Sequence, residues 1–250
     1  MSGGQGGAIL RVLATLVVVA LALVGVHHLI ELSATHVFQP DVLHQIVKDA
    51  VAKHANETNP AHVIDEVVVQ MKKAYPVRIV SPPPPPPHLC RSVLEMVTST
   101  LSQNHIAQDT PYILNVAGGA MGAMKVLHCS LSEYILIFGT PTGTEGHSGR
   151  HLADDYFHIL FGEQLAAAPG TLLAEVYNPG DMHLMKRGVA KQYKMPSATW
   201  ALEYARGDIP SMFPFGLFDS ILSTVDPITI WQTVYISIQL MMHELAQGKI

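Results

Sequence analysis

A series of short strand-like runs between Tyr112 and Arg206 limits the fold of this chain more than any other feature. Turn residues separate the runs, which are YILNV, KVLHCS, EYILIFG, Ala153–Leu160, LLAEVYN and ATWALEYAR. Short strands at this spacing favour a β-sandwich or small barrel over a parallel sheet with crossover helices. We therefore expect residues 111–208 to form the β core of one domain, a size that suits a chain of 250 residues.

A long apolar run precedes this core. From Val12 to Ile30 the only polar residues are Thr15, His27 and His28, and a helix rising about 1.5 Å per residue over this length crosses a hydrocarbon core of about 30 Å. The run exceeds the roughly 7–15 residues of a signal-peptide core, so a transmembrane helix within residues 1–35 is favoured over a cleaved signal. A hydrophobic fraction of 48% with 14% charged residues fits contact with lipid.

Residues 36–110 are predicted to be helical. Apolar residues three and four apart predict one helix before Asn59 and a second after it, with Asn59 as its cap and Pro60 in its first turn. Six consecutive prolines, 82–87, predict a polyproline spacer, for which a ligand of an SH3-type domain is the alternative. A short helix is expected over Leu89–Leu101.

The C-terminal residues 209–250 are strongly apolar, and no Lys or Arg occurs between Arg206 and Lys249. Pro227 divides this region into two predicted helices, and Asp226 is positioned to cap the second. The acidic residues and the proline disfavour a second membrane span. We expect two helices that rest on the membrane surface or cover an apolar pocket; ordinary core helices are the alternative.

Charge and cysteine content argue against nucleic-acid binding and against a fold held by disulfides or zinc. The net charge is −5, and the 15 Lys and Arg residues are scattered, so the chain has no basic stripe for a nucleic-acid backbone. Cys90 and Cys129 form neither a disulfide framework nor a pattern with zinc-ligand spacing.

Histidines and carboxylates are concentrated in the segment Glu145–His158, which raises the possibility of a metal site. Strand alternation places His151 and Asp155 on one face and Asp154 and His158 on the other, which weakens that hypothesis. We expect these residues to be solvated or hydrogen-bonded and no metal to be bound. A metal-dependent enzyme remains the alternative.

Glu203 lies in the run ATWALEYAR, on the face that also carries Thr199, Ala201 and Ala205. Alternation alone turns this face toward water, because the other face is more apolar. The small neighbours equally suit a carboxylate inside a barrel that a bulky ligand must approach. Burial there raises the pKa of a carboxyl group and makes it a proton donor.

Five motifs in order closely resemble one known family, that of the fungal C-8 sterol isomerases and the animal sigma non-opioid receptor. They are NVAGGAMGAM (Asn115–Met124), LHCSLSEYILIFGT (Leu127–Thr140), GHSGR (Gly146–Arg150), EVYNPG (Glu175–Gly180) and W-x-x-E-Y-x-R-G-x-IPS (Trp200–Ser211). The resemblance extends from about Val37 to the C-terminus. The segments GTEGHSGRHLADDYF and KQYKMP resemble the isomerase branch.

This resemblance implies a mainly β fold with flanking helices: a cupin-like β-barrel behind one N-terminal transmembrane helix, closed by two C-terminal helices on the bilayer. It further implies a homotrimer, single-pass in the endoplasmic reticulum membrane. The implied partners are a sterol substrate and membrane lipid, with no nucleic acid.

The resemblance also implies an acidic pair within an apolar cavity. One acid falls on Glu203, whereas the position of the other is occupied by Phe157, so we expect Asp155, two residues earlier on the same strand face, to replace it. His151, Asp154 and His183 are secondary candidates. By the same register the expected lining residues are Val116, Met124, Val126, Tyr134, Leu136, Phe138, Phe157 and Leu217.

The activity implied by the resemblance is a shift of the sterol double bond from C8 to C7, which converts fecosterol to episterol in ergosterol biosynthesis. A carboxylic acid protonates the sterol, a carbocation forms, and a carboxylate removes a second proton, so no cofactor is required. The alternative is a non-catalytic, sigma-receptor-like binding protein for sterols or hydrophobic amines.

Overall fold

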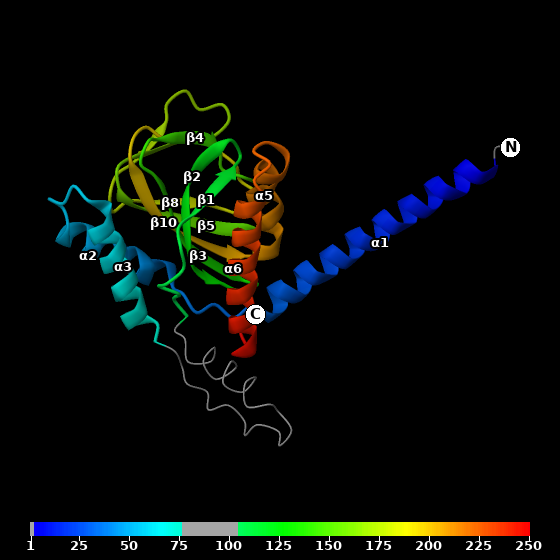
Figure 1. Cartoon of the computed structure of the whole chain (residues 1–250), viewed down its shortest axis with the longest axis horizontal. Coiled ribbons are helices and arrows are strands. Elements are labelled where there is room, and N and C mark those ends of the chain that lie inside the picture. The colour runs from blue at the N-terminus through cyan, green and yellow to red at the C-terminus, as the bar shows by residue number, and fades with distance from the viewer. Residues whose placement is uncertain (1–2, 77–104) are drawn as a thin grey trace, which may run out of the picture.

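One long helix projects from a body of two β-sheets and four further helices among residues 3–76 and 105–250, the part of the chain that the computed structural model describes (Figure 1). Helix α1, Gly3–Ser33, contains an apolar stretch, Ala8–Ser33, that is long enough to cross a membrane. The expected apolar helix is therefore present as a candidate membrane span, and it extends further than the apolar run suggested. The proline run 82–87 and the helix expected over Leu89–Leu101 lie outside the described residues.

Two antiparallel sheets form the β core. The larger sheet has the order β1-β2-β3-β10-β5-β8 and the smaller has the order β4-β9-β6-β7. The strands are β1 Ile113–Ala117, β2 Ala120–Cys129, β3 Glu133–Thr140, β4 Thr144–His147, β5 Ala153–Phe161, β6 Gln164–Ala167, β7 Glu175–Tyr177, β8 Met182–Met185, β9 Gln192–Met195 and β10 Thr199–Gly207. The expected mainly β fold with flanking helices is confirmed.

Both faces of the large sheet are covered, which explains why alternation gave the wrong side for Glu203. On β10, Leu202 and Tyr204 point outward and pack beneath helices, whereas Ala201 and Ala205 point into the second core between the sheets. Glu203 shares the inner face with these alanines. The expectation that it faces water is wrong, because the more apolar face of the strand is covered by helices.

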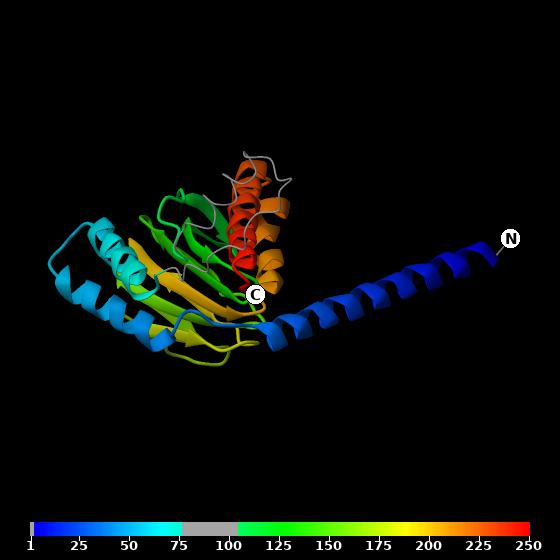
Figure 2. The same cartoon turned by 90° about the horizontal axis from the view of Figure 1, so that it is seen from below.

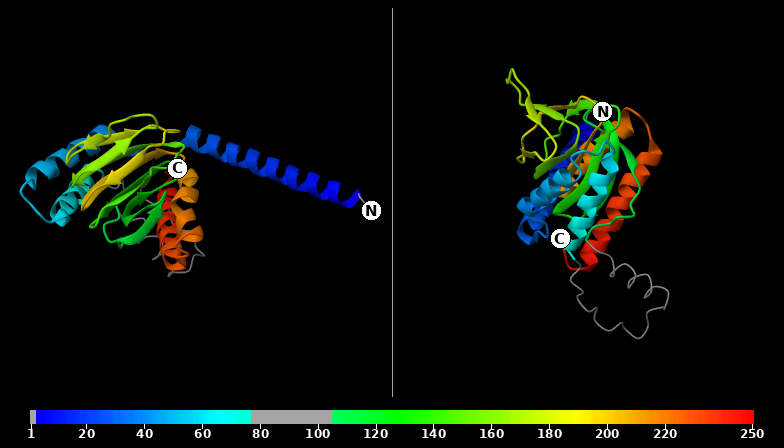
Figure 3. Two further views of the ribbon diagram at one scale, coloured as in Figure 1. Left: turned by 90° about the horizontal axis from the view of Figure 1, so that it is seen from above. Right: turned by 90° about the vertical axis from the view of Figure 1, so that its left-hand side faces the viewer.

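Two helices cover that outer face. They are α2, Pro40–Lys53, and α3, Pro60–Ala74, which bury Leu43, Val47, Val67 and Met71 against it. Asn59 caps α3, because its side chain accepts a hydrogen bond from the Ala61 amide at 3.0 Å. Figure 3 shows these helices on the opposite side of the sheets from the C-terminal helices.

The C-terminal residues form a short 3-10 helix, Ile209–Met212, followed by α5, Phe213–Leu222, and α6, Pro227–Ala246. Asp226 caps α6 as predicted, accepting hydrogen bonds from the amides of Ile228 and Thr229 at 3.1 Å. Both helices lie on the side from which α1 projects (Figure 2). Their exposed large apolar side chains are Phe218, Ile221, Leu222, Ile228, Trp231, Tyr235, Ile238, Met242 and Leu245.

A buried carboxylate ties these parts together. Glu133, at the start of β3, is 0% exposed and accepts hydrogen bonds from the amides of Val37 and Phe38 at 2.8 and 3.0 Å, just after α1. It also accepts from the Tyr204 hydroxyl at 2.6 Å and the Lys249 ammonium at 2.5 Å. The Glu133 side chain thus joins the linker after α1, the central strands β3 and β10, and the C-terminus.

Four strands were not expected from the sequence: β4, β6, β8 and β9. Each has four residues, too few for alternation to distinguish a strand from a loop. In the expected strand LLAEVYN only Glu175–Tyr177 is extended in a sheet. Leu172 and Leu173 instead belong to the β6–β7 connection and are 97% and 87% exposed.

Candidate functional site

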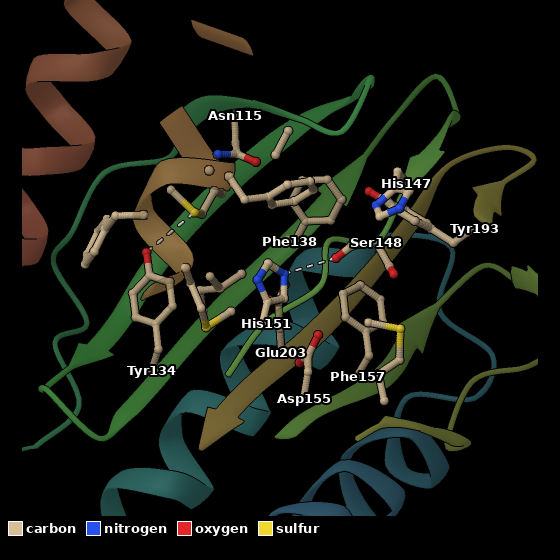
Figure 4. A pocket seen from close by; sticks show the side chains of 18 of the residues that line it. Asn115, Tyr134, Phe138, His147, Ser148, His151, Asp155, Phe157, Tyr193 and Glu203 are labelled. Atoms are coloured by element: carbon tan, nitrogen blue, oxygen red, sulfur yellow. Dashed lines mark hydrogen bonds between the residues drawn. The ribbon is translucent and has the colours of Figure 1, made fainter. Parts of the chain in front are cut away.

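An apolar cavity lies between the two sheets and beneath α5 (Figure 4). Its free volume is about 130 Å³, or about 1010 Å³ when the space at its mouth is included. Six of the expected lining residues are there: Met124, Tyr134, Leu136, Phe138, Phe157 and Leu217. Residues of α5, among them Phe213 and Leu217, line this cavity together with strands of both sheets.

Two carboxyl groups lie within this apolar lining. Glu203 on β10 pairs with Phe157 on β5, and Asp155 pairs with Ala205, so the two acids are diagonal neighbours on adjacent strands. Diagonal side chains on one face of a sheet are close enough for long side chains to interact. Figure 4 shows both carboxyl groups pointing into the same part of the cavity.

The environment of the pair favours protonation. Asp155 is 7% exposed, and its Oδ1 has no hydrogen-bond partner among the described residues. Burial, and then the charge of Glu203, raise the pKa of Asp155 well above its usual value. Burial likewise raises the pKa of Glu203, whose accessible surface faces the cavity. Two carboxyl groups so placed cannot both ionise readily, so the pair retains a proton at neutral pH.

His151 lines the same cavity, and its Nε2 lies 3.2 Å from the Ser148 carbonyl. Burial lowers its pKa, so the ring is neutral at pH 7 and donates its proton to that carbonyl. Figure 4 shows the ring above the two carboxyl groups. His151 therefore bounds the polar part of the cavity without adding a charge.

His183, the other secondary histidine, connects the cavity lining to a polar cluster. Its Nε2 accepts from the Lys191 ammonium at 3.1 Å, so Nδ1 carries the proton and donates to the Gln164 side-chain oxygen at 3.2 Å. Burial, followed by the charge of Lys191, lowers the pKa of His183 to about 4. The ring of Tyr177 stacks on the imidazole of His183, with the two ring centroids 4.4 Å apart.

Three expected site residues lie elsewhere. Val116 is on the face of β1 opposite to Asn115 and Ala117, which do line the cavity. Val126 is buried in the core between the sheets but does not reach the cavity. Asp154 faces the outer side of β5, where it accepts a hydrogen bond from the Arg187 amide at 2.8 Å.

Several lining residues were not singled out from the sequence. They are Asn115, His147, Ser148, Gln164, Tyr193, Met212, Phe213, Phe215 and Thr233. Tyr193 lies in the motif KQYKMP, and the charges of both acids contribute to its raised pKa after burial. That motif was the one sequence signal that pointed to it, because β9 is too short for alternation to orient its side chains.

The histidines and carboxylates of Glu145–His158 do not assemble into a metal cluster. Within the described ranges, three such ligand groups approach one another in two other places, His54–Glu57–His62 and His105–His128–Glu244. Neither place adjoins the cavity. His151 and Asp155 share the cavity, whereas Asp154 and His158 lie on the far side of the sheet.

Gly149 makes room for His151, which gives a prediction. A Cβ at Gly149 would lie 2.2 Å from His151 Nε2 and 3.0 Å from the Phe215 ring. Gly149→Ala is expected to displace His151 and to weaken ligand binding in the cavity about tenfold. Gly170→Ala is the matched control, because both glycines have φ near 90° but a Cβ at Gly170 meets nothing within 4 Å.

Both variants carry the backbone cost of a non-glycine residue at positive φ, about 1–2 kcal/mol, so their difference isolates the contact with His151. Thermal unfolding measures the loss of stability that both variants share. Displacement of a bound hydrophobic amine measures the affinity of the cavity for its ligand. Equal binding by the two variants would contradict the assigned packing.

Comparison with known proteins identifies the family of this chain. Residues 12–249 match the family described as "ERG2 and Sigma1 receptor like protein". The C-8 sterol isomerase ERG2 of Gibberella zeae is 39% identical, over 100% of this chain and 94% of that protein. The sigma non-opioid intracellular receptor 1 of Gallus gallus is 42% identical over 51% of this chain and 57% of that protein.

Among solved structures, an RmlC-like cupin from Shewanella frigidimarina aligns with 42% of this chain and 92% of its own, at 16% identity and a TM-score of 0.36. The sequence matches span nearly the whole chain, including the segments that carry Asp155 and Glu203. The chain belongs to the family of ERG2 and Sigma1 receptor like proteins.

Proposed function

We propose that this chain is a C-8 sterol isomerase that shifts the sterol double bond from C8 to C7, with fecosterol as substrate and episterol as product. One observation carries the proposal: two carboxyl groups with raised pKa values lie together in a mainly apolar cavity. The isomerase relatives match at about 40% identity over most of the chain, which supports the same reaction.

The chemistry needs one acid and one base. The protonated carboxyl group transfers its proton to C9, the electron pair of the C8–C9 double bond forms the new C9–H bond, and a tertiary cation is left at C8. The carboxylate then removes a proton from C7, and that C–H electron pair becomes the C7–C8 double bond. The proton count of the Asp155–Glu203 pair is restored, so the reaction consumes no cofactor.

The cavity supplies the remaining stabilisation. The negative charge left on the pair lies beside the developing cation, in a site where few competing dipoles screen it. The rings of Tyr134 and Phe138 line the same cavity and add cation–π attraction. The same features predict that protonated hydrophobic amines bind there as mimics of the cation.

A second function is supported by the receptor match, which covers half of the chain. In that alternative the cavity binds sterols or amines without turnover. Expression in a fungal strain that lacks its own C-8 sterol isomerase separates the two functions. An isomerase removes the accumulated Δ8-sterols, whereas a binding protein leaves them unchanged.

The pKa directions predict the pH dependence of turnover. Both folded-state pKa values are raised, so the shared proton persists above the range of about 4 in which free carboxyl groups ionise. Raising the pH through the upper pKa of the pair removes the acid, and lowering it through the lower pKa removes the base. A bell-shaped profile of kcat/KM with its alkaline limb well above pH 4 is expected. A loss of activity centred near pH 4 as the pH rises contradicts the assignment.

We place the protein in the endoplasmic reticulum membrane, with α1 as its single span and α5 and α6 on the bilayer surface. The apolar side chains that α5 and α6 expose on the side of α1 support this placement. We also propose a homotrimer. The exposed Leu172, Leu173 and Val176 offer an apolar patch for a second copy of the chain, and the mass of the detergent-solubilised protein tests the assembly.

A further inference from the structure

A second, polar cavity lies where α1 ends. Its volume is about 260 Å³, and it is bounded by the last turn of α1, the following linker, β5, β10 and the loop after β8. Its polar lining residues are Glu31, His36, Asp154, Tyr156, Arg187 and Arg206. None of these residues lines the sterol cavity, because Asp154 and Arg206 are on the outer face of the sheet.

One of the two arginines is already engaged. Arg187 Nη1 lies 3.0 Å from a Glu31 carboxylate oxygen, and the Arg187 amide donates to Asp154 Oδ1 at 2.8 Å. These contacts join the end of α1 to β5. Arg187 therefore forms part of the wall, and its charge is balanced by Glu31.

The other arginine, Arg206, has no such partner among the described residues. Among the described residues, the guanidinium of Arg206 has neither a hydrogen bond nor an ion pair. Its neighbours across the strands are Asp154 and Glu133, but Glu133 is occupied by four other donors. Asp154 lies beyond ion-pair distance. The five N–H donors of Arg206 thus border a cavity large enough for a ligand, and guanidinium groups bind phosphate in a bidentate manner.

The position of the cavity limits what that ligand can be. Glu31 lies in the last turn of α1, at the end of the apolar stretch Ala8–Ser33. With α1 across a bilayer, the end of its apolar stretch lies at the lipid headgroups, which extend the roughly 30 Å hydrocarbon core to about 40–45 Å in all. The cavity therefore lies at the depth of the phosphate and amine groups of the lipids.

We propose that this cavity binds the headgroup of a zwitterionic phospholipid, with the phosphate on Arg206 and the ammonium group beside Asp154. The proposal rests on the membrane placement of α1 given above. The lining charges select this headgroup, because two arginines face two carboxylates, and burial keeps His36 neutral by lowering its pKa. An anionic headgroup would leave Asp154 and Glu31 facing negative charge.

The test compares wild type with Arg206→Gln and Asp154→Asn after each protein is purified in detergent and stripped of lipid. Phosphatidylethanolamine is added in micelles, and the lipid that stays bound is counted by native mass spectrometry. We expect one tightly held lipid per wild-type chain and binding at least about tenfold weaker in Arg206→Gln. In Asp154→Asn, the preference for phosphatidylethanolamine over phosphatidylglycerol should be lost. Lys194→Gln, an exposed cation 2.9 Å from Glu145, is the matched control.

Three results would overturn the proposal. They are equal lipid retention by wild type and Arg206→Gln, equal occupancy by inorganic phosphate at the same concentration, and a lower melting temperature of Arg206→Gln in the absence of lipid. The last result would make Arg206 a structural residue. Carbonate extraction separates this proposal from the membrane placement, because protein released from membranes contradicts the placement itself.

Discussion

Glu203→Gln is expected to lower kcat/KM for a Δ8-sterol by about 10²–10⁴-fold, the contribution usual for a positioned acid or base. The amide keeps the shape of the side chain but neither donates nor accepts the transferred proton. Asp155→Asn is expected to cause a similar loss. Because the two carboxyl groups act as one unit, the double variant should lose little more than either single variant.

The folded protein should tolerate Glu203→Gln, since the carboxyl group is buried with a raised pKa and the amide removes a desolvation cost. Melting temperature and membrane retention should therefore match wild type. Glu145→Gln is the control, an exposed carboxylate on β4 that pairs with Lys194 at 2.9 Å. Near-normal turnover by Glu203→Gln would exclude Glu203 from the proton transfer.

Glu133→Gln is expected to cause the largest loss of stability, about 3–5 kcal/mol in the free energy of unfolding. The substitution leaves the Lys249 ammonium, which is 5% exposed, without its counter-ion. It also removes one of the two oxygens that accept from the Val37 and Phe38 amides. Unfolding in detergent is commonly irreversible, so the inactivation half-life at fixed temperature is the measurement.

Two comparisons sharpen this test. Glu66→Gln breaks an exposed pair with Lys53 at 2.7 Å and should change the free energy of unfolding by less than about 1 kcal/mol. The double variant Glu133→Gln/Lys249→Met removes the stranded charge and should recover part of the loss. An unchanged half-life for Glu133→Gln alone would show that the buried pair does not hold α1, β10 and the C-terminus together.

The sequence predicts the long, regular elements well. The apolar run before residue 33, the capped helices at Asn59 and Asp226, and the longer strands have strong periodicity, and all of them are present. Local pattern is sufficient there because each element is specified by neighbouring residues. The four-residue strands escaped detection, since two or three alternating positions are not distinguishable from a loop.

The acidic pair was predictable in part. Alternation correctly placed Asp155 with Phe157 and apart from Asp154. It could not say which face of β10 is inside, because helices cover one face and the core between the sheets covers the other. The resemblance supplied that choice for Glu203. For Val116 it was the resemblance that gave the wrong prediction. The resemblance implied a cavity-lining residue, whereas Val116 lies on the outer face of β1.

Glu133 could not be found from the sequence at all. At the start of an apolar strand a glutamate is usually solvated, and its partners are the linker after α1, Tyr204 and Lys249, which lie far away along the chain. Only the folded arrangement brings them together. The same holds for the cavity that surrounds Arg206.

The most direct test of the central claim is turnover of fecosterol by the purified protein in D₂O. Acid catalysis by an exchangeable carboxyl group predicts episterol with deuterium at C9, undiminished after treatment with a chelator and absent in Glu203→Gln. Episterol that keeps only its original hydrogens, or a wild-type protein that binds fecosterol and forms no episterol, would contradict the account.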